Sequence, residues 1–169
     1  MEAIEAILSR RSIRKYTDQS IPEQVLTELI KTAMNAPSAG NQQPWQFIVL
    51  DDKKILKEIT NFHPYAQALK NAPAAIVVCG DLNLEHFKGY WLQDCSAATM
   101  NILTTAHAKG LGAVWLGIYP ETERITGLKK LLTLPEQIIP LAVVSLGYPA
   151  EKKEPAARYQ ESRIHYNGW

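Results

Sequence analysis

Residues 74–79, with the sequence AAIVVC, constrain the fold of this chain more than any other segment. They give six apolar residues in a row, so a strand here would present apolar side chains on both of its faces. Such a strand is stable only where other elements cover it on both sides. The run therefore predicts a layered domain in which helices flank a sheet.

Three other segments are also rich in strand-forming residues, and helical patterns separate the segments from one another. The further strands are predicted over residues 45–50, 112–118 and 140–146. Apolar residues recur at helical spacing in residues 2–10, 22–33, 52–59, 65–71, 90–109 and 122–131. The pattern indicates an α+β or α/β domain with about four strands and about five or six helices.

The longest predicted helix covers residues 90–109 and is apolar almost all round. Ala97, Ala98 and Met100 make its second face small and apolar as well. A helix of this kind lies at the centre of a domain or packs against a partner subunit. Gly110 is expected to end it, since glycine adopts the left-handed conformation that follows many helices.

Composition argues against several classes of function. The chain has 169 residues and a formal net charge of only +1, whereas a dedicated nucleic-acid-binding domain usually carries a larger basic excess. No apolar run reaches the ~20 residues of a membrane span, and no secretory signal is visible. Cys79 and Cys95 lie in apolar segments, as expected for reduced thiols in a cytoplasmic protein. We therefore expect neither a nucleic-acid partner nor a membrane partner.

The usual catalytic and cofactor motifs are missing. Residues 110–112 (GLG) lack the third glycine of a dinucleotide-binding loop, and they precede a strand where that loop must follow one. No metal site is expected, because metal-ligand spacing is absent among His63, His86, His107 and His165. If the chain is an enzyme, a bound cofactor is expected to carry the chemistry.

Three separated segments offer what a planar cofactor with an anionic group needs. Residues 10–14 (RRSIR) concentrate arginine, whose rigid fork suits a phosphate. Residues 37–45 (PSAGNQQPW) form a turn dense in short polar side chains beside an aromatic. Residues 115–120 (WLGIYP) place a glycine at a strand end, where a flat ring can approach the backbone. Taken alone, each segment is also compatible with an ordinary role as a helix end, a surface loop or a core strand.

In combination these motifs resemble those of the nitroreductase-like family of FMN-dependent oxidoreductases. RRSIR is followed by APSAGNQQPW, WLGIYP, LGYP and a tail that bears Arg158 and ESRIHYNGW, so the resemblance covers essentially the whole chain. It implies an α+β fold with a central, mostly antiparallel sheet of four to five strands wrapped by helices. It also implies a single domain over residues 1–169 and a homodimer that binds FMN between its subunits. The tail over about 148–169 is expected to pack on the partner.

The resemblance also assigns roles to residues that match its motifs. The opening arginine segment would hold the phosphate, ribityl chain and pyrimidine edge of FMN, with Arg158 as a second phosphate ligand. The turn at 37–41 would reach the flavin of the other subunit, and the glycine strand end would lie along the ring near N5. The candidate cofactor-binding residues are thus Arg10, Arg11, Ser12, Arg14, Pro37, Ser38, Asn41, Gln67, Leu116, Gly117 and Arg158.

The implied activity is reduction of a small acceptor, such as a nitroaromatic, a quinone or an enone, by a ping-pong mechanism with NADH or NADPH as reductant. The flavin would carry the chemistry, and Arg14 would act as an electrostatic stabiliser. The segment between Cys79 and Tyr90 is expected to cover part of the site. The alternatives are a flavin-binding or flavin-sensing protein without turnover, a dehalogenase or flavin-fragmenting member of the family, and a nucleic-acid binder that uses RRSIRK.

Overall fold

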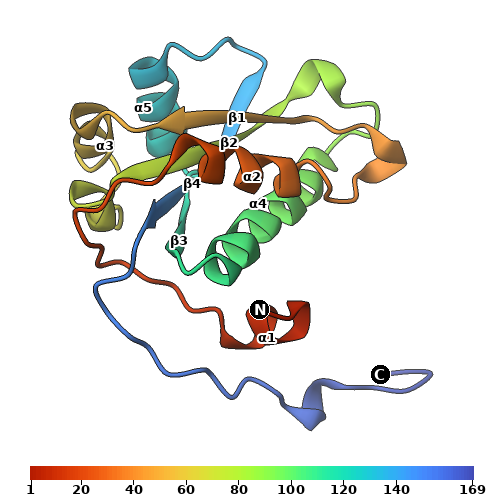
Figure 1. The fold of residues 1–169 in the computed structure, drawn as a ribbon. Helices are drawn as coiled ribbons and strands as arrows, with labels where there is room; N and C mark the ends of the chain where they lie inside the picture. The colour runs from red at the N-terminus through yellow and green to blue at the C-terminus, as the bar shows by residue number, and fades with distance from the viewer.

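The computed structural model describes residues 1–169 and contains five α-helices and four β-strands (Figure 1). The helices are α1 (Ala3–Ser9), α2 (Glu23–Ala33), α3 (Lys53–Ile59), α4 (Trp91–Ala108) and α5 (Thr122–Leu132). The strands are β1 (Trp45–Leu50), β2 (Ala74–Asp81), β3 (Gly112–Gly117) and β4 (Ile138–Gly147). The predicted α+β class, with a sheet of about four strands, is therefore confirmed.

The four strands form one antiparallel sheet in the order β1-β2-β4-β3. β2 and β4 are central, and all residues from 74 to 80 are buried. Successive side chains of β2 enter two separate cores: Ile76 and Val78 point into one, Ala75 and Val77 into the other. The prediction that this strand is covered on both faces is thus confirmed.

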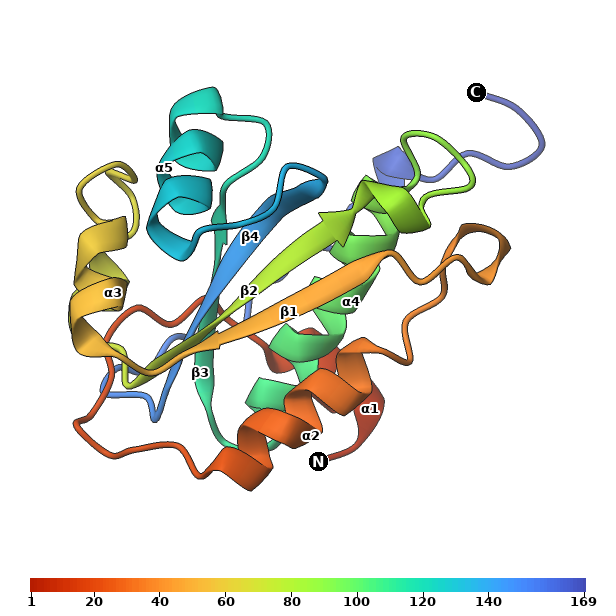
Figure 2. The same cartoon turned by 90° about the horizontal axis from the view of Figure 1, so that it is seen from above.

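Helices α2 and α4 cover one face of the sheet, and α3 and α5 cover the other (Figure 2). The first core contains Leu29 of α2 and Ile102 of α4, whereas the second contains Leu56 of α3 and Leu128 of α5. The molecule thus has three layers, helices on both faces of one sheet. The outer strands β1 and β3 are the two edges of that sheet.

Helix α4 is central, as its apolar sequence predicts, and buries residues from Trp91 to Ala106 along its length. It ends at Ala108, and Gly110 has a positive φ of 78° as expected for the residue after a helix. Helix α1 packs against α4 through Ala6, which is 1% exposed. None of the helices is long and apolar enough to span a lipid bilayer.

Two predicted elements differ from the structure in extent. Residues 65–71 form only a short 3-10 helix, at Gln67–Lys70. The last strand begins at Ile138, ahead of the predicted start at Pro140. Proline lacks the N–H that a central strand must donate, which makes it a natural strand boundary in sequence. The structure instead accommodates it at a register shift, where Pro140 faces Cys79.

The two ends of the chain meet beside β3. The Ile13 N–H donates to the Ala113 carbonyl at 3.0 Å, so residues 10–14 run along the exposed edge of β3. The start of the C-terminal tail pairs with the same opening segment, since the Ala150 N–H donates to the Lys15 carbonyl at 2.9 Å. Beyond this point the C-terminal tail leaves the body and runs past α1 (Figure 1). The edge strand, the opening arginine segment and the tail therefore lie together.

Candidate functional site

A cavity of about 460 Å³ opens beside the edge strand β3. It is lined by three groups of residues that are distant in sequence: Arg14; the 63–67 loop; and the end of β3 with the start of α5. The lining residues are Arg14, His63, Pro64, Tyr65, Gln67, Trp115, Leu116, Gly117 and Arg124. Four of the candidate residues from the sequence, Arg14, Gln67, Leu116 and Gly117, thus share one cavity.

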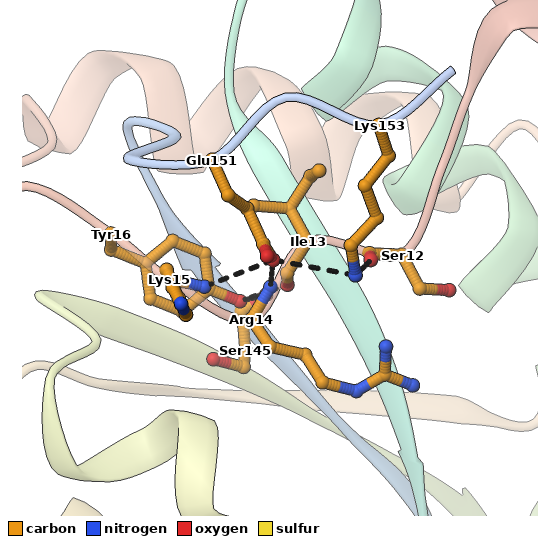
Figure 3. Close-up of polar contacts among 8 residues, drawn as sticks. All are labelled: Ser12, Ile13, Arg14, Lys15, Tyr16, Ser145, Glu151 and Lys153. Carbon is orange, nitrogen blue, oxygen red and sulfur yellow. Dashed lines mark hydrogen bonds and ion pairs between the residues drawn. The ribbon is translucent and has the colours of Figure 1, made fainter. Parts of the chain in front are cut away.

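The main chain at Arg14 is fixed by the tail (Figure 3). The N–H groups of Arg14 and Lys15 donate to Glu151 Oε1 at 2.6 and 3.3 Å, and the first of these hydrogen bonds is the main cause that lowers the Glu151 pKa. Lys153 donates to the Ser12 carbonyl at 2.8 Å and pairs with Glu151. The Arg14 side chain extends away from Glu151 and makes neither a hydrogen bond nor an ion pair, so its guanidinium is free for a ligand.

Three arginines gather where the opening segment meets the tail. Burial, and then the charges of Arg158 and Arg11, lower the Arg10 pKa, so these cations lie close enough to repel one another. Arg10 Nε is buried and has no hydrogen-bond partner. Arg11 donates to the Glu154 carbonyl and has no carboxylate partner. A cluster of cations with an unused buried donor is suited to an anion with several oxygens, such as a phosphate.

Gly117, at the end of β3, provides a flat and open part of the cavity wall. A Cβ added to Gly117 would have no atom within 4 Å, so the direction in which a side chain would point is empty. Its φ is not in the left-handed region, and the backbone conformation alone does not require glycine. The absence of a side chain therefore leaves space for a planar ligand against the backbone.

The turn at residues 37–41 lies elsewhere in the chain. Pro37, Ser38 and Asn41 precede β1 at the edge of the sheet opposite to β3, and none of them lines the cavity. The turn is held by the buried Asp94 of α4, which accepts from the Ala39 N–H at 2.9 Å. A ligand that contacts both this turn and the cavity would need two copies of the chain.

The segment between Cys79 and Tyr90 packs on that turn and contributes no residue to the cavity beside Arg14. The N–H groups of His86 and Phe87 donate to Gln42 Oε1 at 2.9 and 3.0 Å. The Phe87 ring lies against Gly40, where no side chain would fit. Within one chain this segment lies away from the Arg14 cavity, because the buried Gln42 amide attaches it to the turn on the opposite side of the sheet. That it covers part of the site stays a prediction.

Five residues of the cavity were not among the candidates from the sequence, and three of them carry polar or aromatic groups suited to a ligand: His63, Tyr65 and Arg124. His63 is 1% exposed, neither of its ring nitrogens has a partner, and burial and then the Arg124 charge lower its pKa. Arg124 donates to the Gly117 carbonyl at 3.0 Å and lies 5.6 Å from the centre of the Tyr65 ring. One signal was available, because Arg124 places a cation in the first turn of α5, where the helix dipole disfavours positive charge.

Comparison with known proteins connects this fold to a family. The model of the nitroreductase family matches residues 7–63 and 62–148. A protein of Methanothermobacter thermautotrophicus, provisionally named an NADH dehydrogenase/NAD(P)H nitroreductase, is 46% identical over 100% of this chain and 88% of that protein. A crystal structure from Parabacteroides distasonis, with the same provisional name, has a TM-score of 0.95 at 42% identity over 99% of this chain and 98% of that chain.

A third comparison includes a bound ligand. The crystal structure of a provisionally named nitroreductase from Desulfovibrio desulfuricans, in complex with FMN, has a TM-score of 0.86 at 28% identity. The match covers 100% of this chain and 98% of that chain. The family model and the related structures agree along nearly the full length of this chain, which belongs to the nitroreductase family.

Proposed function

We propose that this protein is an FMN-dependent oxidoreductase that uses NADH or NADPH to reduce a small acceptor. The observation that carries the proposal is the cavity lined by Arg14, Gln67 and the open Gly117 at the end of β3, with the buried, unpartnered Arg10 Nε in the segment that runs along the same strand. A phosphate and a flat ring joined by a short chain would find both of their sites along β3. The names of the relatives, and the FMN bound to one of them, support the same activity.

The residues present fit FMN. The buried, unpartnered Nε of Arg10 and the neighbouring cations would hold the phosphate. The open wall at Gly117 would accept the ring, with Leu116 beside it. Arg14 and Gln67 carry polar groups at the same cavity and would bind the polar edge of the ring. Ser12, which forms a bridge to Ala113 on the same edge strand, would lie between these two sites.

FMN, when bound, supplies the transfer of reducing equivalents from the dinucleotide to the acceptor. Arg14 provides a positive charge on a main chain that Glu151 holds in position, and it would stabilise negative charge that develops on the ligand. No side chain is required as an obligatory acid. The reductant and an acceptor such as a nitroaromatic, a quinone or an enone would occupy the same cavity in turn, which is ping-pong kinetics.

The active form in this proposal is a homodimer in the cytoplasm. The turn with Pro37, Ser38 and Asn41 lies at the edge of the sheet opposite to the cavity, so a second copy would bring it to the flavin. Apolar side chains of α1 and aromatic side chains of the tail over 148–169 are exposed and would be covered by that copy. Cys79 and Cys95 are both buried free thiols, in keeping with a reducing compartment.

The test starts from colour. A purified preparation is expected to be yellow and to bleach when NADH or NADPH is added without oxygen. In Arg14→Ala we expect FMN affinity to fall by about tenfold, the cost of one charge-assisted contact, together with a slower reduction rate. Lys15→Ala is the matched control, because Lys15 is also an exposed cation but does not line the cavity.

Two results would reject the proposal. One is unchanged flavin absorbance and unchanged oxidation of NAD(P)H in Arg14→Ala. The other is a protein that binds FMN but never oxidises NADH or NADPH at steady state, which would favour a flavin-binding or flavin-sensing protein without turnover.

A further inference from the structure

Three residues of the cavity, Arg124, Tyr65 and His63, have no part in the contacts proposed for FMN. They come from the start of α5 and from the loop after α3, and they lie in contact with one another. Their chemistry is that of a ligand site: a cation, an exposed aromatic ring and a buried imidazole without partners.

Arg124 is an unpaired cation. The cavity lining includes Arg14 and Arg124 but neither aspartate nor glutamate. The only hydrogen bond of the Arg124 guanidinium is the one that it donates from Nη1 to the Gly117 carbonyl, and it forms no salt bridge. A guanidinium has five N–H donors, so most of those on Arg124 are unused. A fixed cation with spare donors at a cavity favours an anionic group on the ligand.

Tyr65 presents a flat apolar surface beside that cation. The residue is 74% exposed. Two side chains nonetheless pack against its ring: the Arg124 guanidinium lies 5.6 Å from the ring centre, and the His63 ring lies 6.5 Å away, centre to centre, at an interplanar angle of 88°. An exposed aromatic ring in a defined position is suited to stacking on a planar ligand.

His63 adds an unpartnered polar group to the same wall. The residue is 1% exposed, and neither Nδ1 nor Nε2 has a hydrogen-bond partner. Both ring nitrogens are inaccessible, so the imidazole acts on the cavity by packing against the Tyr65 ring.

We propose that Arg124 and Tyr65 form an acceptor-binding subsite that selects planar, unsaturated compounds with a carboxylate. Arg124 would bind the carboxylate as a two-pronged donor, and Tyr65 would stack on the ring that bears it. The inference deepens the proposed function and rests on it, since it names the substrate class of the same cavity.

Binding to the oxidised, FMN-loaded protein tests the proposal without turnover. Dissociation constants for 4-nitrobenzoate and 4-nitrobenzamide, which differ only in the charged group, are measured by calorimetry. The natural protein should bind the carboxylate about tenfold more tightly, as expected for a charge-assisted contact. Arg124→Gln should bring the ratio close to one, and Arg124→Lys, which keeps the charge but loses the fork, should retain part of it.

Two further variants separate this role from a general effect of charge or packing. Lys130→Gln removes an exposed cation from the same helix outside the cavity and should leave the ratio unchanged. Tyr65→Leu should weaken both ligands by a similar factor, because stacking does not depend on the carboxylate. Flavin content and circular dichroism of each variant show that the folded holoprotein is being compared.

The outcomes are distinct from those of the proposed function. Equal affinity of the natural protein for the two ligands, or a ratio unchanged in Arg124→Gln, overturns the inference even where NAD(P)H oxidation is normal. A raised KM for NADH or NADPH in Arg124→Gln, with the acceptor ratio unchanged, assigns Arg124 to the dinucleotide phosphates and also overturns it. A protein that shows the carboxylate preference but never oxidises NAD(P)H refutes the oxidoreductase and leaves the carboxylate site standing.

Discussion

At Arg10 the chain holds a cation under electrostatic strain. Its guanidinium lies near Arg11 and Arg158, and its buried Nε has no partner. Both conditions are unfavourable in the ligand-free protein, and a phosphate bound at the proposed site would relieve them. Functional sites often retain such locally unfavourable arrangements, whose removal stabilises the protein at the cost of function.

Arg10→Gln is therefore expected to separate stability from binding. The free energy of unfolding of the FMN-free protein should stay the same or rise by up to about 1 kcal/mol, because a source of repulsion is lost. FMN affinity should fall at least tenfold, since the phosphate loses a charged donor. Urea unfolding and a fluorescence titration with FMN measure the two quantities. A variant that is less stable but binds FMN normally would show that Arg10 has a purely structural role.

A substitution at Gly117 should likewise affect FMN binding more than stability. In Gly117→Ala the added methyl group would point into open space, so the thermal unfolding midpoint of the FMN-free protein should change little. FMN affinity should fall by about tenfold or more, because the methyl occupies space that the ring needs. Unaltered FMN affinity, measured by fluorescence quenching, would place the ring somewhere other than against β3.

His63 is expected to make the stability of the folded protein depend on pH. Burial and the Arg124 charge lower its pKa in the folded protein, so the unfolded chain takes up a proton first as the pH falls. The contribution of His63 is fully present above its unfolded pKa of about 6.5 and is lost progressively below it. Urea unfolding between pH 7.5 and 5.5 should show stability falling with pH, and less steeply in His63→Gln. His107, whose pKa is also lowered, should keep part of the slope, and an identical slope in both proteins would contradict the prediction.

Among the elements, one buried polar network around Gln42 joins the end of the 37–41 turn to helix α4. Gln42 Nε2 donates to Asp94 at 2.7 Å, while Gln42 Oε1 accepts from the N–H groups of His86 and Phe87. Every polar atom of the Gln42 amide thus has a partner, and loss of the side chain would leave several buried groups unpaired.

Gln42→Leu should therefore destabilise the protein by about 2–3 kcal/mol, measured by urea unfolding. Gln46→Leu, at an exposed position on β1, is the control and should change stability by less than about 0.5 kcal/mol. Because the network also fixes the turn with Ser38 and Asn41, FMN affinity should fall in Gln42→Leu. Equal stability of the two variants would mean that water replaces the lost partners.

The elements themselves were largely readable from the sequence. Period and propensity located all four strands. The helix predicted over residues 52–59 also forms, and the Asp52 carboxylate before it accepts from the Lys54 N–H at 2.7 Å. Only some of the cavity residues could be predicted from the sequence. Arg14 and Gly117 belong to local motifs, but Tyr65 and Arg124 meet only because the 63–67 loop and the first turn of α5 converge at one end of β3. No local pattern encodes such a contact between distant segments.

For the whole molecule, the exposed apolar surface predicts a dimer. Ile4, Ile7 and Leu8 of α1 are 74%, 55% and 69% exposed, and the tail exposes Tyr159 and Tyr166. Contiguous apolar groups of this kind mark interfaces. Light scattering should give twice the 18.9 kDa mass of one chain.

The double variant Ile4→Glu, Leu8→Glu should be monomeric and should lose most of its FMN, because the partner would no longer supply the turn at 37–41. Val49→Glu changes an exposed apolar residue on β1 in the same way and serves as the control. A natural protein that is monomeric by light scattering and still binds FMN would contradict the dimer.

The hydrogen bond between the Arg14 N–H and Glu151 joins residues 137 positions apart. On the ribosome, Arg14 is synthesised long before Glu151, so a nascent chain can form its first helices without a finished cofactor pocket. With the FMN site proposed above, uptake of FMN is expected to follow translation of the segment around Glu151, and prematurely terminated chains that lack it should be colourless. Because this hydrogen bond joins the two ends of the chain, binding of FMN would report that the chain has been synthesised as far as Glu151.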